Sequence, residues 1–171
     1  MVILATVTFL SPWAALPTPS ATPPPPFPTP ACTAPEFRQF DFWIGSWTVK
    51  NPSGKQVGTS NITQASAGCA IREEWKSVSG NTGMSLNYFD PADRKWHQDW
   101  VGGDGTILHL EGNLAGDAMV LKGPSKTSTG TTLNRITWTL TPNGQVRQEW
   151  STSGDDGASW QTSFIGIYEK S

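Results

Sequence analysis

The chain is poor in several features, and each absence excludes a class of protein. Its 171 residues include no charged side chain before Glu36, only two cysteines and only two histidines. The apolar run near its start, VILATVTFL at 2–10, is too short to span a bilayer. Two cysteines without a Cys/His cluster give no reason to expect structural zinc. Acids and bases number 14 and 12 and are interspersed, so nucleic acid and anionic lipid are not expected partners.

Composition divides the chain near residue 35. Ten of the fourteen prolines precede Glu36, and all seventeen glycines follow it. Residues 1–31 are therefore expected to be a signal-like segment and an extended Pro-rich linker, and residues 32–171 a single folded domain. Because no basic residue precedes the apolar run, two interpretations stay open. In the first, the segment is a signal and the protein is exported, which makes it secreted or periplasmic. In the second, the segment is not a signal.

The two cysteines, Cys32 and Cys69, account for every thiol of the chain. In an exported protein they are expected to form one disulfide that pins the start of the domain to a later strand. Loop closure predicts a stabilisation of roughly 3–4 kcal/mol from such a bond. The alternative is a pair of buried free thiols.

Short alternating runs recur about every ten residues, and turn-rich segments separate them. Helical periodicity is nearly absent. The pattern predicts an all-β domain with strands at 45–51, 56–65, 70–79, 83–89, 95–101, 106–112, 117–122, 132–140, 145–151 and 160–169. Such a meander either stacks as two sheets or closes, and we expect a single antiparallel up-and-down barrel because closure removes the edges. A short helical turn at 35–42, PEFRQFDF, is expected to cover one barrel end.

Three predicted strands share one pattern of apolar, basic, Glu or Gln, acidic and Trp: IREEW at 71–75, WHQDW at 96–100 (in part) and VRQEW at 146–150. Alternate residues of a strand face opposite sides. The basic residue of each motif and the acidic residue next to its Trp are therefore expected outside, where bases and acids can pair with neighbours across strands. The tryptophans and Glu73, Gln98 and Gln148 are expected inside.

Burying three polar side chains without partners would cost of order 1–3 kcal/mol each. They could bond to one another, to Arg135 or to buried water and fix the strand register. They could instead line a cavity with indole walls and orient a small ligand. Alternation leaves open whether Asn87 or Tyr88 joins them. The candidate ligand-binding residues are Glu73, Trp75, Asn87, Trp96, Gln98, Trp100, Trp138, Gln148 and Trp150.

The stretch FDFWIGSW at 40–47 resembles the entry motif of a family of exported bacterial proteins of unknown function. The resemblance continues through GCAIREEW, GMSLNYFD, RKWHQDWV, NRITW and VRQEWSTSGDDGASW and covers residues 32–170. That family is similar to the calycins, the lipocalin and fatty-acid-binding barrels, whose first strand begins with a comparable Gly-x-Trp. The resemblance implies a calycin-like barrel whose first strand begins with Gly45 and Trp47. It also implies an exported location. It implies no activity.

Two further resemblances bear on function. The opening is also similar to that of nitrobindin-like haem barrels, which need an axial histidine inside. His97 and His109 both sort outward unless the register differs, so no haem or other cofactor is expected. Residues 153–160, SGDDGASW, resemble the Asp-box of sialidase propellers. This resemblance implies a structural hairpin in which Asp and Ser side chains bond the turn backbone.

Three functions remain open. The first is binding of a small apolar or aromatic molecule in a Trp-lined cavity, with no stable membrane insertion. The second is a small enzyme that uses Glu73, with a pKa raised by burial, as acid or base. No metal-ligand spacing, nucleophile motif or phosphate loop supports that alternative. The third is a ligand-free structural or interaction module, which predicts a barrel packed solid. The ligand and the oligomeric state do not follow from the sequence.

Overall fold

The computed structural model of the chain describes residues 32–127 and 130–171. The predicted signal-like segment and linker lie outside the described residues. Three short 3-10 segments are present: η1 (Pro35–Arg38), η2 (Asp41–Trp43) and η3 (Ser66–Gly68). The strands are β1 (Gly45–Lys50), β2 (Gln56–Ala65), β3 (Ala70–Ser77), β4 (Thr82–Asp90), β5 (Lys95–Gly102), β6 (Ile107–Ala115), β7 (Ala118–Thr127), β8 (Gly130–Leu140), β9 (Val146–Ser153) and β10 (Gln161–Lys170).

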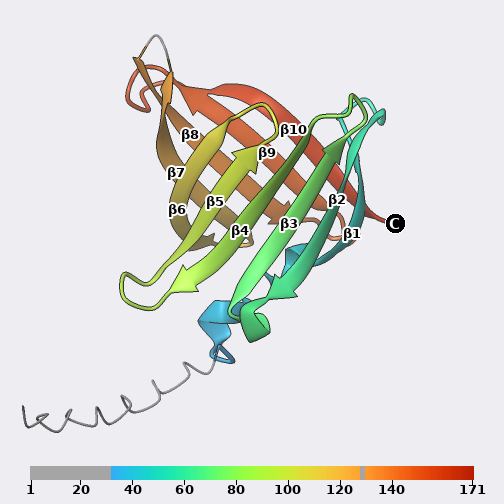
Figure 1. Ribbon diagram of the computed structural model, residues 1–171, viewed down its shortest axis with the longest axis vertical. Helices are drawn as coiled ribbons and strands as arrows, with labels where there is room; N and C mark the ends of the chain where they lie inside the picture. Colours follow the sequence, from blue (N-terminus) through green and yellow to red (C-terminus); the bar gives the residue numbers. More distant parts are fainter. Residues whose placement is uncertain (1–31, 128–129) are drawn as a thin grey trace, which may run out of the picture. The chain divides into compact units, whose positions relative to one another are not determined.

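The ten strands form a closed antiparallel barrel in which each strand pairs with the next along the chain (Figure 1). Pairing of β1 with β10, in which Val49 lies opposite Tyr168, closes the sheet. Closure leaves no edge strand exposed to another chain. The predicted all-β up-and-down barrel is thus confirmed.

Turn chemistry fixes the hairpins at the predicted positions. In the β1–β2 turn, Oδ1 of Asn51 accepts the backbone N–H groups of Ser53 and Lys55. Gly54 in the same turn has a φ of +81°, a conformation that side chains with a Cβ rarely adopt. Asx-type bonding followed by a left-handed glycine reverses the chain within a few residues.

β7 differs most from its predicted span of 117–122, because it continues through Pro124 to Thr127. Proline ordinarily marks a strand boundary, since it cannot donate a ladder hydrogen bond. Pairing with β6 ends at Lys122, whereas pairing with β8 continues through Pro124 opposite Leu133. The ladder with β6 therefore ends before Pro124, so this proline interrupts no pairing recorded with that strand.

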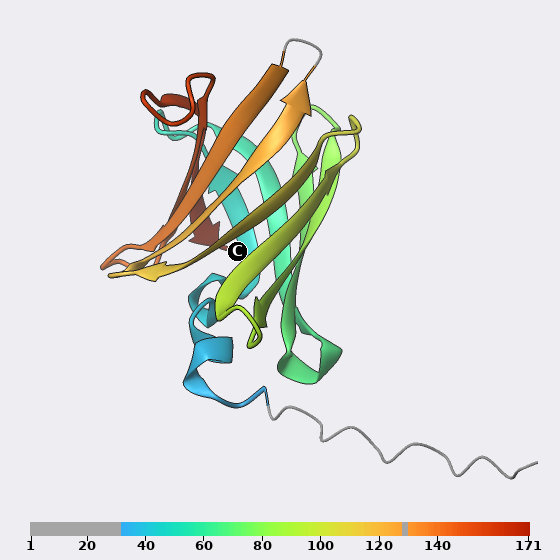
Figure 2. The same cartoon turned by 90° about the vertical axis from the view of Figure 1, so that its left-hand side faces the viewer.

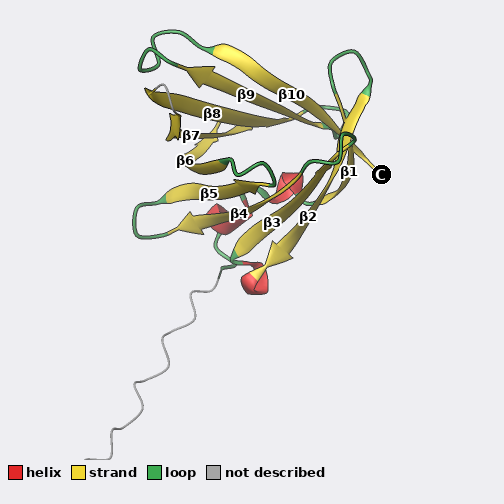
Figure 3. Cartoon of the chain, turned by 45° about the horizontal axis from the view of Figure 1, so that its top comes forward, coloured by secondary structure: helices red, strands yellow, loops and turns green. Residues whose placement is uncertain are grey.

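One end of the barrel is plugged by η1 and η2, which lie at its lower end in Figure 2; helical segments are the red parts seen between and behind the strands in Figure 3. The ring of Phe40 stacks on Trp43 with 5.1 Å between centroids and meets Trp138 edge-on at 5.1 Å. Trp47 donates from Nε1 to the backbone oxygen of Trp43 at 2.8 Å. The predicted helical turn and its place at a barrel end are confirmed. We call the rings of Phe40, Trp43, Trp47, Trp96 and Trp138 the aromatic plug.

A disulfide fastens the chain just before the plug. Cys32 and Cys69 are bonded, with their Cα atoms 5.0 Å apart, as predicted. The bond ties the segment that leads into η1 to the turn between β2 and β3. Among the described residues, no helix is both long enough and apolar enough to cross a membrane.

Candidate functional site

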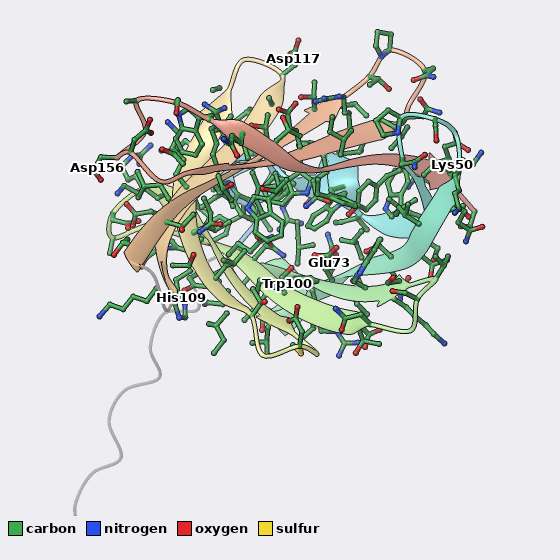
Figure 4. All side chains as sticks on the ribbon, turned by 90° about the horizontal axis from the view of Figure 1, so that it is seen from above. Lys50, Glu73, Trp100, His109, Asp117 and Asp156 are labelled. Carbon is green, nitrogen blue, oxygen red and sulfur yellow. A yellow bond between two sulfur atoms is a disulfide. The ribbon has the colours of Figure 1, made fainter. Side chains whose placement is uncertain are left out.

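The predicted sidedness of the three motif strands holds. Glu73 and Gln98 are 3% and 2% exposed and face the lumen, and Gln148 is half-buried there. Figure 4 shows Glu73 and Trp100 toward the middle of the barrel and His109 and Lys50 at its periphery. Alternation on a pleated strand is the cause, since each of these side chains is flanked by outward-facing neighbours.

The basic residue of each motif and the acidic residue next to its Trp lie outside, as predicted, but their pairing differs in part. Arg147 bonds Glu149 of its own strand, at 2.7 Å, instead of a residue across the sheet. Arg72 and Glu74 pair in the same way at 3.0 Å. Two long side chains on the same face of a strand, two residues apart, can reach each other without a partner strand.

The lumen above the plug contains a cavity of about 310 Å³. It opens among the hairpins at the end opposite η1 and η2. The cavity is bounded by aromatic and apolar side chains in its walls and by a smaller set of polar groups. Its lining consists of Glu73, Trp75, Asn81, Gln98, Trp100, Gly102, Asp104, Thr106, Leu108, Ile136, Gln148, Trp150, Ser163, Phe164 and Tyr168. The barrel is therefore filled at one end and hollow at the other.

Glu73 presents its carboxyl group to this cavity from β3. Its two oxygens each accept one hydroxyl, from Ser60 of β2 and Ser85 of β4, both at 3.0 Å. Burial raises the pKa of Glu73 to about 7, although the hydrogen bonds from Ser85 and Ser60 act in the opposite direction. The carboxyl group therefore changes charge near neutral pH.

A chain of hydrogen bonds continues from Glu73 along the lumen wall. Asn87 donates from Nδ2 to Ser85 Oγ at 2.9 Å, and Gln98 donates from Nε2 to Asn87 Oδ1 at 2.8 Å. Asn87, not Tyr88, is thus the inward-facing residue of that pair. The polar groups satisfy one another across β3, β4 and β5, which fixes the register of these strands.

On the opposite wall Tyr168 donates its hydroxyl to Oε1 of Gln148. Burial, followed by the negative charge of Glu73, raises the pKa of Tyr168 well above its ordinary value. Tyr168 is therefore a neutral donor at physiological pH. Arg135 is not a partner of this polar set, because its guanidinium lies over the ring of Trp160, 4.3 Å from the centroid.

Two glycines provide space for two of the cavity's indoles. A Cβ on Gly83 would lie 2.3 Å from Cη2 of Trp100, and one on Gly58 would lie 2.4 Å from Cη2 of Trp75. Each indole therefore lies across a neighbouring strand at a position without a side chain. Strand glycines often mark such close approaches, and here they keep the two rings at the wall.

Six of the nine candidate residues line the cavity: Glu73, Trp75, Gln98, Trp100, Gln148 and Trp150. Asn87 lies one hydrogen bond behind it. Trp96 and Trp138 are also buried, but they belong to the aromatic plug, where each meets Phe40 edge-on.

The sequence did not single out Tyr168 or Phe164. Phe164 and Tyr168 alternate with Gly166 on the inward face of β10, so alternation could have identified both. A bulge between Thr162 and Phe164 interrupts the pattern, and Ser163 also lines the cavity.

Both histidines face outward, as predicted. His109 is bonded through Nδ1 to Asp99 Oδ1, and His97 through Nε2 to Asp93 Oδ2 at 3.0 Å. No histidine among the described residues therefore points into the lumen, where a haem barrel needs its axial ligand. One group of potential metal ligands, Asp90, Asp93 and His97, meets on the outer surface at the β4–β5 turn. Two of its members accept N–H groups of that turn, so the cluster is explained by the hairpin.

The β9–β10 hairpin has the bonding expected of an Asp-box. Asp155 accepts the backbone N–H and the hydroxyl of Ser159 at 2.9 and 2.6 Å, and Gly157 donates its N–H to Ser153 Oγ. These bonds, led by the Ser159 hydroxyl, lower the pKa of Asp155 to about 2. The motif builds a turn.

The architecture defines the class: a closed ten-stranded up-and-down barrel, consistent with a calycin-like fold, with one plugged end and one hollow end. No protein-family model matches the chain, and no curated protein matches it either.

Proposed function

We propose that the protein binds a small apolar or aromatic molecule in the cavity at the hollow end of the barrel. The observation that supports this most directly is a space of about 310 Å³ whose lining includes Trp75, Trp100 and Trp150. Aromatic walls with a few converging polar groups are typical of small-molecule sites, and this volume lies at the small end of their range. The expected ligand is about the size of one or two fused rings.

The polar residues of the cavity support binding more than catalysis. Glu73 is held by two serine hydroxyls, and the other carboxylate of the lining, Asp104, lies in the β5–β6 hairpin. Among the described residues that line the cavity there is no histidine, lysine or cysteine. The third alternative, a ligand-free module, requires a barrel that is filled throughout. The cavity at the hollow end does not fit that requirement.

We further propose that the protein works outside the reducing cytosol. The disulfide between Cys32 and Cys69 supports this location, because such bonds persist in oxidising compartments. An apolar or aromatic ligand would then be captured from the surroundings of the cell or its envelope.

A cavity-filling variant tests the proposed function. Ile136 of β8 lines the cavity, so Ile136→Trp should narrow it, whereas Leu140→Trp adds the same side chain at an exposed position of the same strand. Calorimetric titration with indole should show saturable binding to the wild type and to Leu140→Trp, and loss of binding in Ile136→Trp with unchanged far-ultraviolet circular dichroism. Equal affinity of all three proteins would place the binding elsewhere.

A further inference from the structure

The cavity differs in charge from the chain as a whole. The full sequence has 12 basic and 14 acidic residues, nearly balanced. Among the described residues that line the cavity there are two acids, Glu73 and Asp104, and no lysine, arginine or histidine. The cavity is acidic although the whole chain is nearly balanced, because the basic residues of the motif strands face outward and form ion pairs there.

Within the part of the chain that the structure describes, Glu73 has no basic partner. Its carboxyl group accepts hydroxyls from Ser60 of β2 and Ser85 of β4, and its negative charge acts on Tyr168 of β10, which stays neutral. A carboxylate has about four acceptor positions, and the two serines occupy one on each oxygen. Positions for further N–H donors therefore remain on a buried group that borders the cavity. A cation that enters the cavity would supply the missing counter-charge.

The walls also favour positive charge. An indole ring carries negative potential on its faces, and a cation within about 6 Å of its centroid is attracted. Trp150 uses its Nε1 to donate to Asn134 at 3.0 Å, so its ring, not its N–H, is what it can offer a ligand. Asp104 adds a carboxylate at the hairpin rim, and hydrogen bonds from Thr106 hold the pKa of Asp104 below its usual value, so it stays charged.

We propose that the cavity selects organic cations: a flat aromatic ring that carries a protonated amine, with the ring among Trp75, Trp100 and Trp150 and the ammonium group on Glu73. This inference rests on the proposed function and narrows its ligand class. The same charges disfavour carboxylates, because an acidic head group would meet Glu73 and Asp104 with no base beside it. A fatty acid is therefore not expected to bind with its carboxylate at Glu73.

Three probes with one ring system test the proposal: tryptamine (a cation), indole (neutral) and indole-3-acetate (an anion), titrated calorimetrically at about pH 8, one unit above the pKa of Glu73. A hydrogen-bonded charge pair predicts that tryptamine binds about 10- to 100-fold more tightly than indole. Indole-3-acetate should bind more weakly than indole.

Two variants assign the preference to one carboxyl group. Glu73→Gln should abolish the preference, so that this variant binds tryptamine no more tightly than it binds indole. Glu74→Gln is the matched control, because Glu74 is the next residue of β3 but faces outward to Arg72. It should retain the full preference for tryptamine. Far-ultraviolet circular dichroism checks that both variants fold, and the wild-type ratio of tryptamine to indole tests the proposal without either variant.

The pH dependence gives an independent readout. As pH rises from about 6 to about 8, Glu73 loses its proton while an alkylamine keeps its own. Tryptamine should therefore bind several-fold more tightly at the higher pH, and indole should not. Indole or indole-3-acetate binding more tightly than tryptamine would overturn the cation preference and leave small-molecule binding intact. Failure of all three probes to bind would instead contradict the proposed function.

Discussion

The two ends of the barrel lumen use the same side chain in opposite ways. At the plugged end Trp43, Trp96 and Trp138 are at most 1% exposed and pack on Phe40. At the hollow end Trp75 and Trp100, like Trp150, remain partly exposed around the cavity. The difference comes from what lies beside them. A segment of chain, η1 and η2, supplies rings to fill the first end, whereas glycines hold two indoles against the wall at the second.

The two ends also differ in how far their buried polar groups are hydrogen-bonded. Nε1 of Trp43 and Nε1 of Trp138 are buried without a hydrogen-bond partner among the described residues. In the cavity, Glu73, Asn87 and Gln98 are joined in one network. Each unpaired buried donor costs about 1–3 kcal/mol. In the plug, close packing of the rings contributes stability that offsets this cost. In the cavity, hydrogen bonds hold the polar groups in place.

The largest effect is expected from truncation of the plug. Trp138 is fully buried between Phe40 and Trp43, so Trp138→Ala should lower the free energy of unfolding by about 3–5 kcal/mol. Urea denaturation followed by circular dichroism measures the loss.

Two controls sharpen the comparison of the ends. Trp75→Ala makes the same truncation in a half-exposed cavity wall and should cost less than half as much. Trp138→Phe keeps most of the ring packing and removes the unpaired Nε1–H, so its loss should also be smaller. Equal losses at Trp138 and Trp75 would show that the two ends contribute alike to stability.

A smaller effect is expected from pH, through Glu73. Its pKa is about 7 in the folded protein against 4.5 ordinarily, so the folded state holds this proton more tightly than the unfolded state. The associated stability is fully present below about pH 4.5 and is lost as pH rises to about 7. Integration over this window gives a loss of about 3 kcal/mol.

Glu73→Gln has no proton to release, so its free energy of unfolding should fall less over the same pH window. Urea denaturation of both proteins at several pH values measures the difference. Glu74→Gln, which changes a solvent-facing carboxyl group on the same strand, should follow the wild-type curve. A wild-type protein that becomes more stable between pH 4.5 and 7, relative to Glu73→Gln, would contradict a raised pKa.

Alternation predicted which side of each strand faces the lumen but not the depth of a residue within it. Trp96 and Trp100 both face inward on β5, yet they are four residues apart, roughly 13 Å along a strand. One reaches the plug and the other the cavity. Depth depends on the tilt and register of the closed barrel, which are properties of all ten strands together. For this reason Trp96 and Trp138 could be predicted as buried but not assigned to an end.

Departures from regular strand geometry limited the prediction of the site in a second way. Phe164 and Ser163 both reach the cavity because a bulge interrupts β10, and period-two reasoning cannot place consecutive residues on one face. The contact of Trp100 with Gly83 joins two different strands, so it depends on register between them. The motif strands, by contrast, carried strong local alternation, and their Glu73, Gln98 and Gln148 were predicted correctly to face inward.

The smallest effect on stability, and the most specific effect on the cavity, is expected from Gly83→Ala. The new Cβ would lie 2.3 Å from the indole of Trp100, so the ring must leave the wall. Overpacking of this kind costs about 1–3 kcal/mol, and the displaced indole borders the cavity, so its movement changes the shape of the cavity. We expect near-ultraviolet circular dichroism to change and the affinity for indole to fall. Gly154→Ala, where no atom lies within 4 Å of the added Cβ, should change neither. Alanine ordinarily stabilises a strand relative to glycine, so a Gly83→Ala protein that is more stable and binds indole unchanged would show that Trp100 does not depend on this glycine for its place at the cavity wall.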